Sequence, residues 1–204
     1  MKLFPVLVCV LLGTAPTVRA AVILSQTFSG GTIPEGDPVG ALFTGTFDQA
    51  ASAQLIQSLT VDVNITGGYD GDLYASLMTP NGTITQLFNE PGLAANGFGA
   101  GGAGMNVTFS DTATQSIQLT TSPDFLTGTY QPAGVLGNME NSAANGTWEI
   151  FFASLGTGGG DATLNNWALD ISTVPEPVYP ALGIFGTCFL AGTSLRRWWR
   201  TKRA

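Results

Sequence analysis

Hydrophobic and polar residues alternate along the middle of the chain. Residues 59–66 read LTVDVNIT, with leucine, valine or isoleucine at every second position and threonine, aspartate or asparagine between them. This period of two predicts a β-strand with one buried and one solvent-exposed face. A Gly-Gly-Tyr-Asp-Gly turn, a second alternating run at 72–78, a Pro-Asn-Gly turn and a third strand at 83–88 follow. We expect the rest of the body to pack on these strands.

The pattern in the rest of the body predicts more short strands and shows no convincing helical period. These strands are expected at 22–28, 41–47, 105–110, 115–119, 147–154 and 164–171. About nine strands without a helical period indicate an all-β fold, a jelly-roll-like antiparallel β-sandwich over residues 21–173. Trp148 and Trp167 fall at inward strand positions, which favours a place in the core over a role as sugar-binding platforms.

Two long connections separate these strands. The glycine-rich segment 89–104 carries no charge after Glu90, and its composition predicts a mobile surface loop, with a functional loop as the alternative. Residues 123–137 contain several glycines and prolines and are predicted to form a turn-rich crossing.

The first twenty residues have the organisation of a secretory signal peptide. Lys2 supplies the positive start, residues 3–12 are apolar, and Val18-Arg19-Ala20 resembles a small-residue cleavage site. The alternative is a buried first strand. An apolar run at the extreme N-terminus with this charge beside it favours export.

The last segment, residues 174–204, predicts a single transmembrane helix. Residues 178–195 form eighteen positions without a charge, and as a helix they would span about 27 Å, close to the roughly 30 Å of a bilayer core. A basic cluster follows directly: Arg196, Arg197, Arg200, Lys202 and Arg203. Because basic clusters stay in the cytoplasm, the body is expected outside it, with the last nine residues inside.

The charges exclude several classes of function. Residues 21–174 contain thirteen of the fourteen acidic residues and no lysine, arginine or histidine, and such a surface repels nucleic acid. The chain has no histidine, and its two cysteines, Cys9 and Cys188, lie in the end segments. This excludes Ser–His–Asp and Cys–His catalytic sites and zinc bound by histidine or cysteine in the body. Among the ionisable side chains of the body, carboxylates therefore remain as the candidates for catalysis or metal binding.

Two groups of residues resemble the P domain (P/Homo B domain), a β-sandwich module found beside subtilisin-like proprotein convertases. The first group is Ile65-Thr66, Tyr69, Gly71-Asp72-Leu73, Leu77 and Pro80-Asn81-Gly82-Thr83. The second is Phe109, Asp111, Pro132, Gly146-Thr147-Trp148, Ile150, Asp161, Leu164, Trp167 and Leu169. The chain departs from the family pattern at Gly67-Gly68, where a histidine is frequent, and at Asp70, where a basic residue is common. These 204 residues include no protease domain, so a role beside a protease is not carried over.

The tail resembles the PEP-CTERM sorting signal of bacteria. Pro175-Glu176-Pro177, the apolar stretch and the arginine-rich end occur in the order of that signal. The resemblance implies recognition by an exosortase, a membrane enzyme thought to cut near the Pro-Glu-Pro and to release or transfer the body. A permanent membrane anchor is the alternative. A buried core helix is disfavoured because the basic cluster has no acidic partner nearby.

Four aspartates are candidate ligands for Ca²⁺: Asp70, Asp72, Asp111 and Asp161. Asp70 and Asp72 share one tight turn, and Asp111 and Asp161 fall near other turns at positions that match the P-domain pattern. Calcium prefers several carboxylate and carbonyl oxygens in flexible loops, so some of these aspartates are expected to bind it. The alternative is structural: Asp72 accepts backbone N–H bonds in its turn and the others are solvated.

Together these features predict a secreted, non-catalytic bacterial protein of the cell surface or extracellular matrix. Its expected partners are an exosortase, the inner membrane before processing, and an extracellular polysaccharide, but no nucleic acid. A calcium-dependent carbohydrate-binding or adhesion module is the alternative. A glycoside or other hydrolase is a third possibility, although no local pattern points to the cleft with two acids that it needs.

Overall fold

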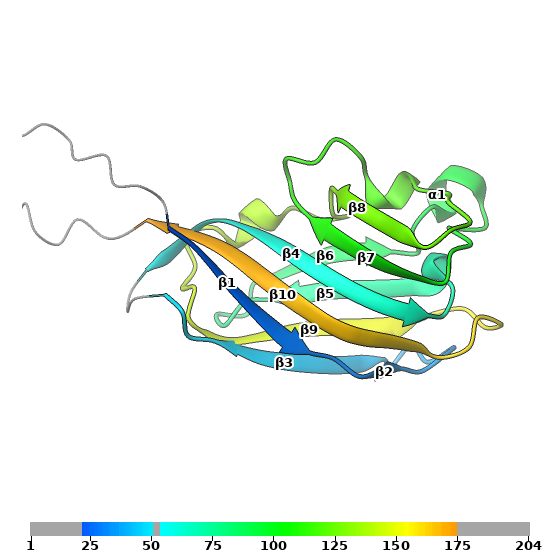
Figure 1. The fold of residues 1–204 in the computed structure, drawn as a ribbon, viewed down its shortest axis with the longest axis horizontal. Coiled ribbons are helices and arrows are strands. Elements are labelled where there is room, and N and C mark those ends of the chain that lie inside the picture. Colours follow the sequence, from blue (N-terminus) through cyan, green and yellow to red (C-terminus); the bar gives the residue numbers. More distant parts are fainter. Residues whose placement is uncertain (1–21, 51–53, 175–204) are drawn as a thin grey trace, which may run out of the picture.

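The computed structural model describes residues 22–50 and 54–174, which form two β-sheets packed face to face (Figure 1). In spatial order, sheet A contains β1 (Val22–Ser29), β10 (Ala162–Val174), β4 (Leu55–Gly67), β7 (Gly104–Phe109) and β8 (Leu126–Tyr130), and β2 (Thr32–Ile33) also pairs with β10. Sheet B contains β3 (Ala41–Phe47), β9 (Gly146–Ser154), β5 (Leu73–Met78) and β6 (Ile84–Asn89). Four short helices lie in the connections: η1 (Asp70–Asp72), α1 (Leu93–Asn96), η2 (Ile117–Leu119) and η3 (Leu136–Met139). The prediction of an all-β sandwich is confirmed.

The pairing of β1, β10 and β4 defines two ends of the molecule. Val22 pairs with Thr173, and Val174 pairs with Leu55, so the start of β1, the end of β10 and the start of β4 meet at one end. We call this the terminal end; it lies on the left of Figure 1. At the opposite end, which we call the loop end, Ala162 pairs with both Gly67 and Ile33.

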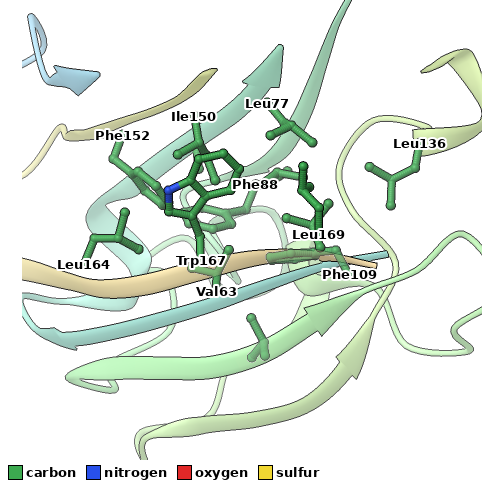
Figure 2. Close-up of a cluster of buried hydrophobic side chains, with 14 of the residues drawn as sticks. Val63, Leu77, Phe88, Phe109, Leu136, Ile150, Phe152, Leu164, Trp167 and Leu169 are labelled. Atoms are coloured by element: carbon green, nitrogen blue, oxygen red, sulfur yellow. The ribbon is translucent and has the colours of Figure 1, made fainter. Parts of the chain in front are cut away.

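The core forms because alternate residues of each sheet point inward. In β4, Leu59, Val61, Val63 and Ile65 are buried, as their period of two predicts. Figure 2 shows side chains of both sheets meeting around Trp167, with Leu164 and Leu169 of its own strand and Ile150 and Phe152 of β9 nearby. Trp148 and Trp167 are completely buried, which confirms their predicted place in the core and removes them as sugar-binding platforms.

The sandwich is not wholly antiparallel. Leu126–Tyr130, expected within a turn-rich crossing, forms edge strand β8, which pairs in parallel with β7. Gly128 lies inside this strand with a φ of 115°, so the residue that suggested a turn is a local distortion of an edge strand. The strand expected at 115–119 is also wrong, because Ile117–Leu119 forms the short helix η2. These errors concern an irregular edge strand and a single helical turn, and sequence patterns predict both kinds of element poorly.

The glycine-rich loop 89–104 folds back on the body. The backbone N–H groups of Asp70 and Gly71 donate to the carbonyls of Gly102 and Ala100, each at 2.9 Å, and Gly92 N–H donates to Gln118 at 3.1 Å. Its composition suggested a mobile excursion, but repeated backbone bonds to η1 and η2 fix its path. A run of small residues allows this close approach, since Gly71 and Gly99 lie too near each other for a Cβ on either.

The predicted signal peptide, residues 1–20, and the predicted membrane helix, residues 178–195, lie outside the described residues. Within residues 22–50 and 54–174, no helix is long and apolar enough to cross a membrane.

Candidate functional site

The four aspartates predicted to bind calcium do not come together. Asp70 lies three residues after the end of β4, at the loop end. Asp111 follows β7, whose Phe109 pairs with Val61 near the middle of β4. Val61 and Gly67 are six residues apart, which corresponds to about 20 Å along a strand. Asp111 therefore belongs to a different part of the molecule from Asp70. Among the described residues, no three histidine, cysteine or acidic side chains lie close enough to hold a metal ion.

Asp70 is a buried carboxyl group under the glycine-rich loop. Its side chain is 0% exposed, and its Oδ1 accepts the N–H of Gly104 at 2.9 Å. Its Oδ2 is buried and has no hydrogen-bond partner in the described part of the chain. Burial raises the pKa of Asp70 from 3.8 to about 7, although the Gly104 hydrogen bond acts in the opposite direction. Near neutral pH, both the protonated and the ionised form of Asp70 are therefore populated.

Asp72 and Asp161 lie near Glu35 at the loop end, beside the turn formed by residues 156–160. The Glu35 carboxylate accepts the N–H groups of Gly158 and of Gly160, the latter at 2.9 Å, and these bonds to Gly160 and Gly158 lower its pKa. Asp161 Oδ1 accepts the backbone N–H of Glu35 at 3.0 Å. Partial burial, followed by the negative charge of Glu35, raises the pKa of Asp72. Most of these carboxylates thus have backbone partners and help to close the turn.

Asp111 lies in a shallow pocket between β4, the end of β7 and η3. Asp111 Oδ1 accepts the N–H of Leu136 at 3.0 Å, and Oδ2 accepts the N–H of Gly137 at 2.7 Å. These are the first residues of η3, so the carboxylate satisfies helix-start N–H groups that have no partner within the helix. The pocket beside it has a volume of about 240 Å³ and also contains Glu140.

Two acidic residues of these clusters, Glu35 and Glu140, were not predicted. Glu35 is separated from the turn at 158–160 by more than 120 residues in sequence, and no motif connects them. Glu140 lies in a segment that the sequence assigns only to a crossing. Both positions depend on long-range folding, and a pattern of neighbouring residues contains no signal for either.

Comparison with known proteins places this architecture in a family. The family model of the proprotein convertase P-domain matches residues 56–171. A search of curated proteins gave no match. Two similar solved structures are the crystal structure of the serine protease of Aeromonas sobria (TM-score 0.47) and that of this protease in complex with a chaperone (TM-score 0.48). Each is 13% identical, and the match covers 77% of this chain and 28% of the other. Because the family model spans more than half of the 204 residues, this chain belongs to the proprotein convertase P-domain family.

Proposed function

We propose that the chain is a secreted, non-catalytic protein of a bacterial cell surface or extracellular matrix. In this proposal a signal peptide at residues 1–20 exports the P-domain sandwich. A PEP-CTERM signal at residues 174–204 holds it briefly at the inner membrane until an exosortase processes it. The observation that carries the proposal is the pairing of Val22 with Thr173, which brings both ends of the body to one end of the sandwich.

This arrangement suits a body that is delivered from one side. The segments before Val22 and after Val174 both leave the terminal end, so a leader and a membrane tail would approach the same membrane without crossing the domain. The loop end, with η1 and the turn at 156–160, would then face away from the membrane. An acidic body without a basic residue also agrees with the predicted orientation, because the basic residues other than Lys2 and Arg19 of the leader lie in the tail, whose end is expected to stay inside.

The chemistry of the carboxylates supports a non-catalytic role. General acid and base catalysis needs titratable groups that reach a substrate in a cleft. Asp70, whose pKa is raised to about 7, is completely buried. Glu35, which is half-buried, and Asp111, which is exposed, are held by two backbone N–H groups each. Glu35 and Asp111 are therefore committed to backbone bonds, although Asp111 also borders the pocket beside η3, and Asp70 lies out of reach of a substrate.

Mass spectrometry of the protein from the producing bacterium tests the sorting proposal. We expect the protein outside the cytoplasm, beginning near Ala21 and ending near Pro175-Glu176-Pro177. Glu176→Gln should retain the tail and leave the protein in the membrane fraction, whereas the matched change Glu149→Gln in β9 should be processed normally. Recovery of the intact 204-residue chain from the cytosol would contradict the proposal.

A calcium-dependent module is the second candidate function, and Asp70 is the observation that favours it. A buried carboxylate oxygen without a partner could be satisfied by a cation, and calcium accepts backbone carbonyls beside a carboxylate. The separated positions of the four aspartates favour a site at the loop end alone. If calcium binds there, millimolar calcium raises the melting temperature of the wild type and of Asp111→Asn, but not of Asp70→Asn. An unchanged wild-type melting temperature removes this candidate.

A further inference from the structure

The pocket beside η3 combines hydroxyl groups, carboxylates and a small apolar floor. It is lined by Ser58, Leu59, Thr60, Ser110, Asp111, Thr112, Leu136, Gly137 and Glu140. Four of these side chains carry hydroxyl groups, two carry carboxylates, and two leucines supply apolar surface. A concave site in which a few polar groups converge over apolar surface is typical of a site for a small polar molecule. Its volume of about 240 Å³ exceeds what a bare metal ion would fill.

The two carboxylates of the pocket face the same glycine. A Cβ placed on Gly137 would lie 3.4 Å from Asp111 Oδ2 and 3.7 Å from Glu140 Oε1. Asp111 is held in place by its bonds to the Leu136 and Gly137 N–H groups. A carboxylate has about four acceptor positions, so these two bonds leave it able to accept more. The space above Gly137 is therefore bordered by two negative groups that can still bind a donor.

The body provides no positive side chain for this pair. Residues 21–174 contain no lysine, arginine or histidine, so a positively charged partner for these exposed carboxylates would come from outside those residues. A charged donor such as an ammonium group forms stronger hydrogen bonds with carboxylates than a neutral donor does. Ser110 Oγ lies 2.9 Å from Thr112 Oγ1 and accepts the Thr112 N–H at 3.3 Å, so these two hydroxyl groups already have partners. A simple alkylamine would leave the hydroxyl groups of Ser58 and Thr60 unused. A ligand that carries both an ammonium group and several hydroxyl groups uses the whole lining.

We propose that this pocket binds an amino sugar with a free ammonium group, such as a hexosamine residue of an extracellular polysaccharide. The ammonium group lies above Gly137 between Asp111 and Glu140, and the sugar hydroxyls face the serine and threonine side chains. The biological setting rests on the proposed extracellular function. The binding itself is measured on purified protein, so failure of export and failure of binding give separate results.

Titration of the full chain, purified in a mild detergent, with D-glucosamine tests the proposal. The measurement uses isothermal calorimetry at low ionic strength and mildly acidic pH, where the amine is protonated. N-acetyl-D-glucosamine is the control, because it keeps the ring and lacks the charge. We expect saturable binding of glucosamine and binding of the N-acetyl sugar that is weaker by about tenfold or more. Absence of glucosamine binding, or equal binding of the two sugars, overturns the proposal.

Two variants locate the binding in this pocket. Gly137→Ala adds a methyl group between the two carboxylates at ordinary contact distances, so it should fold normally and weaken glucosamine binding by about tenfold. Its matched control is Gly101→Ala, whose Cβ would have Pro123 Cα at 3.8 Å as its nearest contact. Glu140→Gln should also weaken binding, whereas Glu149→Gln, on sheet B, should not. Wild-type affinity in both Gly137→Ala and Glu140→Gln contradicts the site.

A last titration separates a sugar from a protein ligand. Nα-acetyl-L-lysine amide presents an ammonium group on an alkyl stem without hydroxyl groups. We expect it to bind about tenfold more weakly than glucosamine, because it leaves the hydroxyl lining unused. Equal or tighter binding would assign the pocket to a lysine side chain of a partner protein and overturn the amino-sugar proposal.

Discussion

Asp70 lies at the loop end of the sandwich, Asp111 lies beside the middle of β4, and the two have opposite environments. Asp70 is completely buried and accepts one N–H bond, from Gly104, and its pKa rises to about 7. Asp111 is exposed and accepts two N–H bonds, from Leu136 and Gly137. From the sequence, both Asp70 and Asp111 were predicted to be calcium ligands. The difference shows that the burial and hydrogen bonding of an aspartate depend more on the chain segment that covers it than on the residues next to it in sequence.

The covering segments differ in what they offer to a carboxylate. At the loop end, residues 99–104 close over Asp70 and exclude water, while giving it the single N–H of Gly104. Beside η3, the helix begins with N–H groups directed at Asp111, and the opposite side of the carboxylate stays open to the pocket. The loop end therefore contains a carboxyl group that is costly to ionise, whereas the carboxylate beside η3 accepts two backbone N–H bonds.

The largest effect is expected from the ionisation of Asp70. Between about pH 4 and pH 7, the native protein keeps the proton that the unfolded chain has already released, because the pKa is raised from 3.8 to about 7. Stability should therefore fall as the pH rises through this window and become level above it. Since one pKa unit corresponds to about 1.4 kcal/mol, the loss is about 4 kcal/mol. Urea unfolding at a series of pH values measures it.

Asp70→Asn identifies the residue responsible. Asparagine has the shape of the protonated carboxyl group and cannot ionise, so we expect it to remove most of the slope and to stabilise the protein above pH 7. Asp111→Asn, the matched change at the other aspartate, should leave the slope in place. A wild-type protein whose stability does not fall between pH 4 and 7 contradicts the environment described for Asp70.

The second effect concerns how tightly the glycine-rich loop covers Asp70. In Gly102→Ala the new Cβ would lie 2.2 Å from the carbonyl oxygen of Asp124 and 2.6 Å from Asp70 Oδ2. Backbone must move to relieve such a contact, so we expect a loss of about 1–3 kcal/mol. The neighbouring change Gly101→Ala, with its nearest contact at 3.8 Å, should cost little. Equal stability of the two variants by thermal unfolding would show that the loop does not press on Asp70.

The sequence predicted the strands better than the sites because the two depend on different interactions. The run predicted over 72–78 differs from β5 by one residue, and 59–66 lies within β4. Both predictions succeed because the period of two reflects a local division between buried and exposed faces. The parallel strand β8 was missed because its pattern is short, with three exposed residues in the middle, and Gly128 suggests a turn.

The candidate sites depend on contacts between distant segments. Asp70 is buried by residues about thirty positions further along the chain, and Glu35 is held by a turn more than 120 residues away. The motif Asp-Gly-Asp identified the residues at 70 and 72 as notable, but it could not reveal that one is buried and the other only partly so. Burial of a carboxyl group is a property of the folded layers, and the local sequence does not contain it.

The third effect concerns Asp111, whose carboxylate is expected to stabilise the start of η3. Asp111→Ala removes both acceptors from the N–H groups that start η3 and should destabilise the protein by about 1–2 kcal/mol. Asp111→Asn keeps one acceptor and should cost about half as much. Because Asp111 is exposed, neither change should reach the effect expected for Asp70. Chemical denaturation at neutral pH, with slopes compared between variants, measures both losses, and an unaffected Asp111→Ala protein would show that η3 does not need this carboxylate.

The smallest effect on stability is expected from Gly137→Ala, and this variant gives the sharpest test of the difference between the loop end and the region beside η3. Gly137 has no left-handed φ, and its added Cβ would contact Asp111, Val135 and Glu140 at 3.4–3.7 Å, so the native state accommodates it. Alanine also restricts the unfolded chain, and we expect a gain of about 0.4–1 kcal/mol. Gly102→Ala, the same chemical change at the loop end, should have the opposite sign because Asp70 and Asp124 leave no room for it. If both substitutions destabilise equally, the region beside η3 is as closely packed as the loop end, and the pocket above Gly137 is too small for a ligand.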